Sequence, residues 1–344
     1  MPEENKTRVV HPIIYPLAIL KYHLFDKPIY ALKSWAYEQN AVIPAENPTE
    51  YIQSPAPQPL IQQTVANRQV ICDEHPPQYK LDAAIPAKSP TMALEFVAGI
   101  SPQGEPVIVD FCAAPHILAA GTTGSGKSVF IHSMLRQLIQ KYPASELKMV
   151  LIDPKGTELE FYKYAKNTIG DVRTDAEQAS KALDEVIEMM DKRNALFTSR
   201  GCRDIKRFNS KFPHEKMPLI LVVIDEFADL ILTDEFDFEL KVKRIAAKAR
   251  SAGIHLFLAT QRPDAKVITG GIRGNFNYTI CLRVPRAIES RIVIGEAGGE
   301  KLNGKGDMLI SDGAGLIRRA QGYYVSDDEL DAMADILRSG AGKP

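Results

Sequence analysis

Residues 121–128 read Gly121-Thr122-Thr123-Gly124-Ser125-Gly126-Lys127-Ser128, which fits the phosphate-binding loop pattern G-x-x-x-x-G-K-[ST] at every position. The apolar run before the loop, residues 116–120, predicts a buried strand, and apolar residues recur after it at helical spacing. In that setting backbone N–H groups curl around a β-phosphate at a helix N-terminus, whose dipole favours anions. A glycine-rich turn that matches by chance is the alternative, but the flanking strand and helix favour a nucleotide-binding protein.

The loop also predicts how its ligand is held. Lys127 is placed to reach the β- and γ-phosphates, and the Ser128 hydroxyl is placed to hold Mg²⁺. We therefore expect ATP and Mg²⁺, with the whole loop as the phosphate site: Gly121, Thr122, Thr123, Gly124, Ser125, Gly126, Lys127 and Ser128.

A second apolar run, residues 219–224, ends in the adjacent acids Asp225 and Glu226. In phosphoryl-transfer sites such a strand delivers one carboxylate to Mg²⁺, and a neighbouring carboxylate polarises the attacking water. We assign the metal role to Asp225 and the water role to Glu226. A strand followed by a solvated acidic turn is the alternative. Together with the complete phosphate loop, the acidic pair favours ATP hydrolysis over nucleotide storage.

A third apolar run is followed by Gln261. Parallel strands present their carboxyl ends to one crevice, so Gln261 could sense the γ-phosphate or orient water there. A plain polar strand end is the alternative.

The order of apolar runs predicts an α/β fold. Helical stretches, notably 175–199, alternate with runs that are typical of strands buried on both faces, which indicates a mostly parallel sheet flanked by helices. The expected strands lie at residues 106–111, 117–120, 149–152, 219–224, 254–259 and 278–284.

The first part of the chain differs in composition, because it is rich in proline and contains no glycine before Gly99. We expect an N-terminal helical segment at 1–50, an irregular proline-rich linker with short strands at 51–95, a motor domain at 96–333 and a tail at 334–344. The apolar stretch 9–20 is interrupted by His11, Pro12 and Pro16, so no membrane span is expected. Four scattered cysteines and no secretory signal predict a cytoplasmic location.

A basic sector lies between residues 241 and 291 of a chain whose net charge is −1. Only Asp264 and Glu289 oppose its cations within that range. Such a run can be an ordinary solvated face, but its position beside the expected nucleotide crevice favours a polyanion surface. Its members are Lys241, Lys243, Arg244, Lys248, Arg250, Arg262, Lys266, Arg273, Arg283, Arg286 and Arg291.

Taken together, these motifs resemble the FtsK/SpoIIIE family of DNA-translocating motors from about Gly104 to Glu329. The phosphate loop is shared by many families, whereas the later segments in this order are far more specific. They are PHIL at 115–118, IDPK at 152–155, VIDEFADL at 223–230, ARSAGIH at 249–255, ATQRP at 259–263, VITG at 267–270, ESR at 289–291 and GKGDML at 304–309.

The resemblance implies a RecA-like P-loop NTPase core, assembled as a homo-hexameric ring around double-stranded DNA. It also implies that Arg250 is an arginine finger, which completes the site of the neighbouring subunit and stabilises charge on the γ-phosphate. Arg262, Arg273 and Arg291 match basic positions of the family's pore-facing loops. A lysine common in the family is replaced by Ala287, so Arg286 beside it is a candidate for the missing DNA contact.

We expect no counterpart of the family's membrane-spanning N-terminal region or C-terminal winged-helix domain within these 344 residues. We therefore expect an ATP-dependent double-stranded DNA translocase that serves a plasmid, an integrative element or a phage. The alternatives are a conjugative coupling ATPase with a membrane-bound partner protein, a secretion-type ATPase that moves protein, and a non-enzymatic nucleotide switch. The basic sector favours nucleic acid over protein as cargo, and the acidic pair argues against a switch.

Overall fold

The computed structural model describes residue 79 and residues 93–233 and 236–340. The chain divides into two compact units, Met1–Leu60 and Ile61–Pro344, and the described residues belong to the second unit. The helical segment expected at 1–50 and almost all of the linker expected at 51–95 lie outside the described residues. The expected boundary at residue 333 falls inside the helix α11 (Asp327–Arg338).

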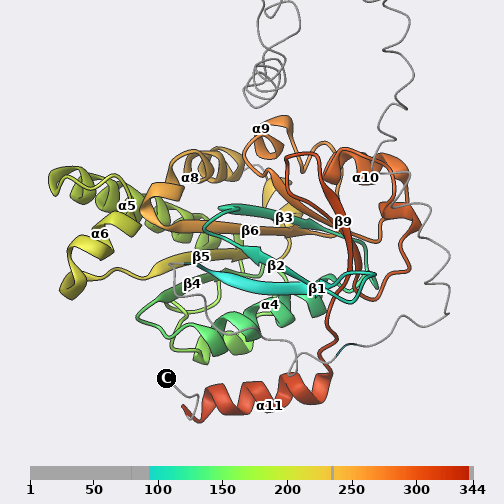
Figure 1. Ribbon diagram of the computed structural model, residues 1–344, viewed down its shortest axis with the longest axis horizontal. Helices are drawn as coiled ribbons and strands as arrows, with labels where there is room; N and C mark the ends of the chain where they lie inside the picture. Colours follow the sequence, from blue (N-terminus) through green and yellow to red (C-terminus); the bar gives the residue numbers. More distant parts are fainter. Residues whose placement is uncertain (1–78, 80–92, 234–235, 341–344) are drawn as a thin grey trace, which may run out of the picture. The chain divides into compact units, whose positions relative to one another are not determined.

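The described residues form one nine-stranded sheet with the strand order β2-β1-β9-β8-β7-β3-β6-β5-β4 (Figure 1). Its strands are β1 (Glu95–Ile100), β2 (Pro106–Asp110), β3 (His116–Ala120), β4 (Leu147–Ile152), β5 (Leu219–Ile224), β6 (Ile254–Thr260), β7 (Tyr278–Leu282), β8 (Asp307–Ser311) and β9 (Ile317–Gln321). The helices before α11 are α4 (Lys127–Lys141), α5 (Ala176–Ser199), α6 (Ile205–Lys211), α7 (Phe227–Ile231), α8 (Phe238–Ala252), α9 (Gly270–Arg273) and α10 (Ala287–Ile294). Short 3-10 helices are η3 (Glu160–Tyr164), η4 (Pro213–Glu215) and η5 (Gly299–Lys301).

The five strands β7, β3, β6, β5 and β4 are parallel neighbours. They include five of the six strands expected from the sequence, and the expected helix at 175–199 is α5. This confirms an α/β fold with parallel strands flanked by helices. Beyond β7, the strands β8, β9, β1 and β2 extend the sheet with antiparallel pairs that the sequence did not predict.

The prediction that the run 106–111 is a strand buried on both faces is wrong. The run forms β2, the outermost strand beside β1, where only alternate side chains are buried. Val107 and Val109 point into the core, whereas Ile108 is 46% exposed. An edge strand with one covered face needs an apolar residue only at every second position.

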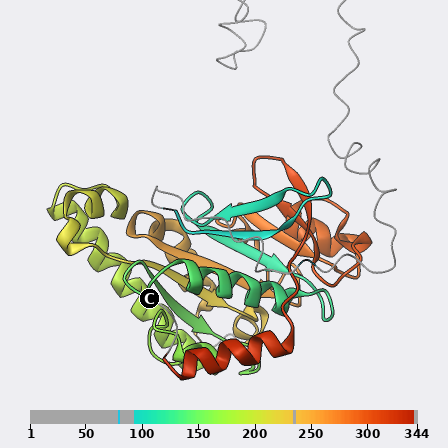
Figure 2. The same ribbon diagram turned by 60° about the horizontal axis from the view of Figure 1, so that its bottom comes forward.

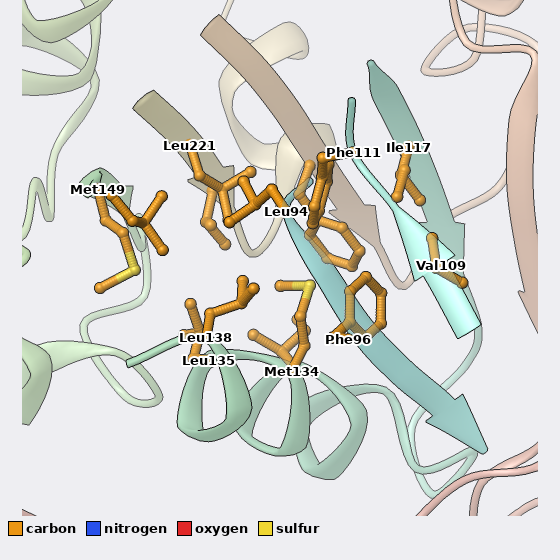
Figure 3. Close-up of a cluster of buried hydrophobic side chains, with 14 of the residues drawn as sticks. Leu94, Phe96, Val109, Phe111, Ile117, Met134, Leu135, Leu138, Met149 and Leu221 are labelled. Atoms are coloured by element: carbon orange, nitrogen blue, oxygen red, sulfur yellow. The ribbon is translucent and has the colours of Figure 1, made fainter. Parts of the chain in front are cut away.

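Two hydrophobic clusters lie on opposite faces of the sheet, because successive side chains of a strand point to opposite sides. Ile117 and Leu221 belong to the cluster that contains the apolar stripe of α4, with Met134 and Leu135, as Figure 3 shows. Their neighbours Leu118 and Ile220 belong to the second cluster, to which α5 and α8 contribute. Figures 1 and 2 show α4 and α8 on opposite sides of the sheet.

Candidate nucleotide site and basic surface

The phosphate loop connects β3 to α4 at the carboxyl end of the parallel strands, as expected from the sequence. Gly124 and Gly126 have φ angles of 78° and 96°, a conformation that side-chain-bearing residues rarely adopt. A Cβ atom on Gly126 would lie 2.4 Å from the backbone nitrogen of Gly306. Glycine is therefore required at position 126 by both the backbone and the close approach of a neighbouring turn.

Backbone hydrogen bonds fix the loop between three other segments. The Gly121 N–H donates to the Thr260 carbonyl at the end of β6 (3.1 Å), and the Thr122 N–H donates to the carbonyl of Arg283 after β7 (3.0 Å). On the opposite side, the Gly306 N–H donates to the Ser125 carbonyl (2.8 Å). The turn before β8, part of the family-like segment 304–309, thus supports the phosphate loop directly.

Lys127 begins α4 and is buried against the end of β5. Its ammonium group donates to the Asp225 carboxylate (2.6 Å) and to the Asp225 carbonyl (2.8 Å). Burial raises the pKa of Asp225, while the charge of Lys127 acts in the opposite direction. The two residues compensate each other in the protein interior, and an incoming phosphate would compete with Asp225 for Lys127.

Glu226 follows Asp225, and only 1% of its surface is exposed. The Thr260 hydroxyl donates to its Oε1 atom at 2.7 Å. The Gln261 N–H lies 3.2 Å from the same oxygen and 3.0 Å from Oε2. The carboxylate that the sequence assigns to water activation is thus turned toward the end of β6. Thr260 belongs to the ATQRP segment, but no sequence pattern links it to Glu226.

A tight loop after β4 forms a further wall of the site. The buried Asp153 carboxylate accepts the backbone N–H groups of Lys155, Gly156, Glu158 and Leu159 at 2.8–3.2 Å. This fixes Lys155, whose ammonium group lies 3.6 Å from Glu226 and 3.8 Å from Asp229. Asp153 and Lys155 belong to the family-like segment IDPK, but neither is predicted from the sequence as a site residue. Their place after a parallel strand was the signal that could have assigned them to the site.

The same loop brings Glu158 to the phosphate loop. The Ser128 hydroxyl donates to Glu158 Oε1 (3.1 Å), and His132 Nε2 lies 3.2 Å from Glu158 Oε2. The hydrogen bond from His132 lowers the pKa of Glu158. Tyr162 contacts the other ring nitrogen of His132 (3.1 Å). Glu158 was not predicted, because its position depends on the fold of the β4 loop.

The sequence predicts Ser128 and Asp225 as the protein ligands of a magnesium ion. In the part of the chain that the structure describes, no group of three or more His, Cys, Asp or Glu side chains could hold a metal. Mg²⁺ in phosphoryl-transfer sites needs only one or two protein oxygens, because phosphates and water complete its shell. Ser128 and Asp225 supply such oxygens, so the residues fit the expected ion.

Gln261 lies where the sequence placed it, beside the phosphate loop. Its side-chain oxygen accepts a hydrogen bond from the Thr123 hydroxyl at 3.2 Å. Together with the bond from Gly121 to Thr260, this contact attaches the end of β6 to the loop at two points.

Arg250 lies at the opposite end of the parallel strands. It lines a cavity of about 650 Å³ with Lys248, Arg203 and His255, close to the start of β6. It also lines a second cavity with His116, the first residue of β3. The phosphate loop follows the last residue of β3, roughly 13 Å further along at about 3.3 Å per residue. Arg250 is therefore not brought together with Lys127 and Asp225 of its own chain.

The basic sector is only partly available to a polyanion, which corrects the expectation of one broad basic surface. On α8, Lys241 pairs with Asp184 (2.6 Å) and Arg244 pairs with Asp191 (2.8 Å), both on α5. Lys243 pairs with Glu239 within the helix. These ion pairs could not be predicted from the sequence, because the acids of α5 are about 50 positions upstream of the basic residues.

The arginines after β6 form a different group. Arg262, Arg273 and Arg291 are exposed, and among the described residues none of them forms an ion pair within 4.0 Å, although the charge of Arg291 helps to lower the pKa of Glu300. Arg286, by contrast, is 71% exposed but is bonded by two nitrogens to Glu289 Oε1 (2.6 and 2.9 Å). We call Arg262, Arg273 and Arg291 the open arginines.

None of the helices within 93–233 and 236–340 combines the length and the apolar character that crossing a bilayer requires.

Comparisons with known proteins agree with the motifs. The sequence model of the FtsK/SpoIIIE family matches residues 84–265. The chain is 45% identical over 258 residues to the DNA translocase SftA of Bacillus subtilis, covering 74% of this chain and 27% of that protein. It is 41% identical over 236 residues to the DNA translocase FtsK of Caldanaerobacter subterraneus, covering 68% and 33%. The chain thus spans about a third or less of these relatives.

Among solved structures, the pCW3 conjugation coupling protein TcpA, in its monomer form with ATPγS, is similar with a TM-score of 0.64 and 31% identity. The similarity covers 77% of this chain and 75% of TcpA. The type VII secretion ATPase EccC of Thermomonospora curvata has the same TM-score at 23% identity, covering 75% and 32%. That second likeness concerns the fold alone.

Proposed function

The chain belongs to the FtsK/SpoIIIE family, and we propose that it is the motor part of an ATP-driven double-stranded DNA translocase. The observation that carries this proposal is the hydrogen-bonded connection from the phosphate loop through the end of β6 to Arg262, one of the open arginines. In that connection a nucleotide site and a candidate DNA surface share one three-residue segment.

In the proposed reaction, residues 121–128 cradle the phosphates of ATP. Lys127 leaves Asp225 to bind the β- and γ-phosphates. Ser128 and Asp225 would hold Mg²⁺, which would neutralise charge on the phosphates. Glu226 polarises the attacking water, and Gln261 contacts the γ-phosphate through its place beside Thr123.

A complete site in this proposal needs a second subunit. Arg250 lies at the other end of the parallel strands from its own phosphate loop, so it suits a site formed with a neighbouring chain. Its fixed charge would stabilise the γ-phosphate of that neighbour. A closed ring, hexameric as the family resemblance implies, gives each subunit one such neighbour.

The open arginines are the proposed DNA contacts. Among the described residues they are exposed and form no close ion pair, and guanidinium groups suit phosphate oxygens. Arg286 would have to leave Glu289 before it could replace the contact missing at Ala287. We place the protein in the cytoplasm, acting for a plasmid, an integrative element or a phage.

A conjugative coupling ATPase, working with a membrane-bound partner, is the second candidate. The specific observation in its favour is the 31% identity to the coupling protein TcpA over most of both chains. A protein-moving secretion ATPase has only the likeness of fold to EccC in its support.

The test is the rate of ATP hydrolysis with and without linear duplex DNA, together with displacement of a third strand bound to that duplex. A translocase is expected to show both DNA-stimulated hydrolysis and strand displacement, and Lys127→Ala is expected to show neither. Hydrolysis that ignores DNA would favour the secretion-type alternative. Stimulation by DNA without strand displacement would argue against movement along duplex DNA.

A further inference from the structure

The segment Thr260-Gln261-Arg262, which we call the β6 junction, touches three parts of the proposed motor at once. Its Thr260 carbonyl accepts the Gly121 N–H of the phosphate loop at 3.1 Å. The Thr260 hydroxyl and the Gln261 N–H both bind the Glu226 carboxylate. Arg262, the last residue of the junction, is an exposed open arginine.

The Thr260 hydroxyl occupies the centre of this arrangement. It donates to Glu226 Oε1 at 2.7 Å and accepts the backbone N–H of Arg262 at 3.0 Å. Thr260 itself is fully buried, so water does not compete for either bond. Movement of the Arg262 backbone therefore alters a hydrogen bond of the hydroxyl that holds Glu226 Oε1. The other contacts of this carboxylate are the Gln261 N–H and, at 3.6 Å, the Lys155 ammonium group.

The position of Glu226 is unsuited to activating water. The carboxylate is 1% exposed, and both of its oxygens accept hydrogen bonds from the β6 junction. A general base must present an oxygen within hydrogen-bonding distance of the water whose proton it takes. Glu226 has to turn away from Thr260 before it can meet a water at the γ-phosphate.

We propose that Thr260 is a positioning residue that holds Glu226 in a resting orientation and releases it when duplex DNA displaces Arg262. This inference rests on the proposed function and adds to it the step that couples DNA contact to hydrolysis. The bond between Gln261 and Thr123 keeps the phosphate loop in register while Glu226 is held.

The experiment compares Thr260→Val, which removes the hydroxyl but keeps the shape, with Thr260→Ser, which keeps the hydroxyl. The hydrolysis rate and the KM for ATP are measured without DNA and with saturating linear duplex DNA. Loss of one hydrogen bond to a charged group is expected to raise the DNA-free kcat of Thr260→Val up to roughly tenfold. KM for ATP and the DNA-stimulated kcat are expected to stay near wild-type values, and Thr260→Ser is expected to behave as wild type.

Thr168→Val is the matched control, because the Thr168 hydroxyl also donates at 2.7 Å, but to the Tyr162 carbonyl outside the β6 junction. It is expected to leave the ratio of stimulated to DNA-free rates unchanged. If Thr260→Val does not fold, as judged by binding of a fluorescent ATP analogue, Thr260→Ala replaces it, since it also lacks the hydroxyl.

The outcomes separate this inference from the proposed function. If duplex DNA does not change the rate of ATP hydrolysis by the wild-type protein, the proposed function itself is wrong. If wild type is stimulated by DNA but the hydroxyl-free variant has an unchanged DNA-free rate, the restraint by Thr260 is wrong. A fall of both rates in that variant would also overturn the restraint, since Thr260 would then orient Glu226 productively.

Discussion

At the scale of single residues, the two neighbouring acids after β5 have different partners. Asp225 binds the ammonium group of Lys127, whereas Glu226 accepts hydrogen bonds from neutral donors at the end of β6 and has the Lys155 ammonium group 3.6 Å away. Removing Lys127 leaves a buried carboxylate without its countercharge, but replacing Glu226 by Gln leaves the phosphate loop and its ion pair in place. The two substitutions should therefore separate nucleotide binding from hydrolysis.

We expect Lys127→Ala to abolish detectable ATP binding. We expect Glu226→Gln to bind ATP with near wild-type affinity but to hydrolyse it roughly 10²- to 10⁴-fold more slowly, the usual contribution of a general base. Equilibrium binding of a fluorescent ATP analogue and single-turnover hydrolysis measure the two effects. Wild-type turnover in Glu226→Gln would show that another group polarises the water.

A second residue-scale prediction concerns the buried histidines near Arg250. Burial lowers the pKa of His255 to about 4 and that of His116 to about 3, and neither Nε2 atom has a hydrogen-bond partner among the described residues. Well above pH 6.5 both rings are neutral whether the chain is folded or not. As the pH falls from 6.5 toward about 4, His255 becomes protonated in the unfolded chain but stays neutral in the folded chain. The free energy of unfolding must therefore fall across this window.

We expect His255→Asn, whose amide can still donate to the Pro115 carbonyl, to make the free energy of unfolding depend less steeply on pH. The slope is expected to fall by up to about 1.4 kcal/mol per pH unit. Urea unfolding between pH 7 and 4 measures it. His214→Asn serves as the control, because His214 is exposed on η4. Equal slopes in wild type and His255→Asn would contradict a neutral buried ring.

At the scale of elements, the sequence predicted the parallel strands because each is a continuous apolar run, such as the six residues of β5. It did not predict β9, whose sequence Ile-Arg-Arg-Ala-Gln has neither a long apolar run nor clean alternation. The carboxyl ends of parallel strands correctly placed Asp225, Glu226 and Gln261 side by side. Glu158 and Thr260 depend on side-chain contacts across the fold, which a linear pattern does not contain.

The pairing of α8 with α5 leads to a prediction about DNA affinity. Replacement of an open arginine, for example Arg273→Ala, should weaken binding of duplex DNA and reduce the slope of log K against log salt by about one. Arg244→Ala should leave the slope nearly unchanged, because Asp191 already neutralises Arg244. Fluorescence anisotropy over a salt series compares the two. Equal losses of slope would mean that α8 also faces DNA.

Arg286 provides a sharper comparison on α10. It binds Glu289, which is nearly buried, and would have to exchange this partner for a phosphate. We expect Arg286→Ala to lower DNA-stimulated hydrolysis less than Arg273→Ala does, while basal hydrolysis is unchanged in both. The rate of ATP hydrolysis, measured over a titration with linear duplex DNA, compares the two variants. A loss in Arg286→Ala that matches Arg273→Ala would show that Arg286 replaces the contact missing at Ala287.

At the scale of the whole molecule, the two ends of the parallel strands carry different halves of the proposed site. The carboxyl ends carry the phosphate loop and both acids, and the opposite ends carry Arg250 beside Lys248 and Arg203. If Arg250 completes the site, as proposed, it must be the Arg250 of another copy, because the chain's own Arg250 lies at the wrong end of the strands. Repeated contacts of this head-to-tail kind either close into a ring or continue as a filament.

Mixed assemblies test this arrangement. Arg250→Ala and Lys127→Ala subunits should each be inactive alone, because one lacks the arginine and the other cannot bind ATP. In a mixture, an intact phosphate loop of an Arg250→Ala subunit can meet an intact Arg250 from a Lys127→Ala neighbour, so some hydrolysis should return. Hydrolysis is measured across mixing ratios, with size-exclusion chromatography to establish that the subunits have exchanged. The control is a mixture of Arg250→Ala subunits with subunits that carry both Lys127→Ala and Arg250→Ala. This mixture contains no intact Arg250 and should stay inactive. Full activity from a verified monomer would place Arg250 outside the reaction, since within one chain it lies a strand's length from the phosphate loop.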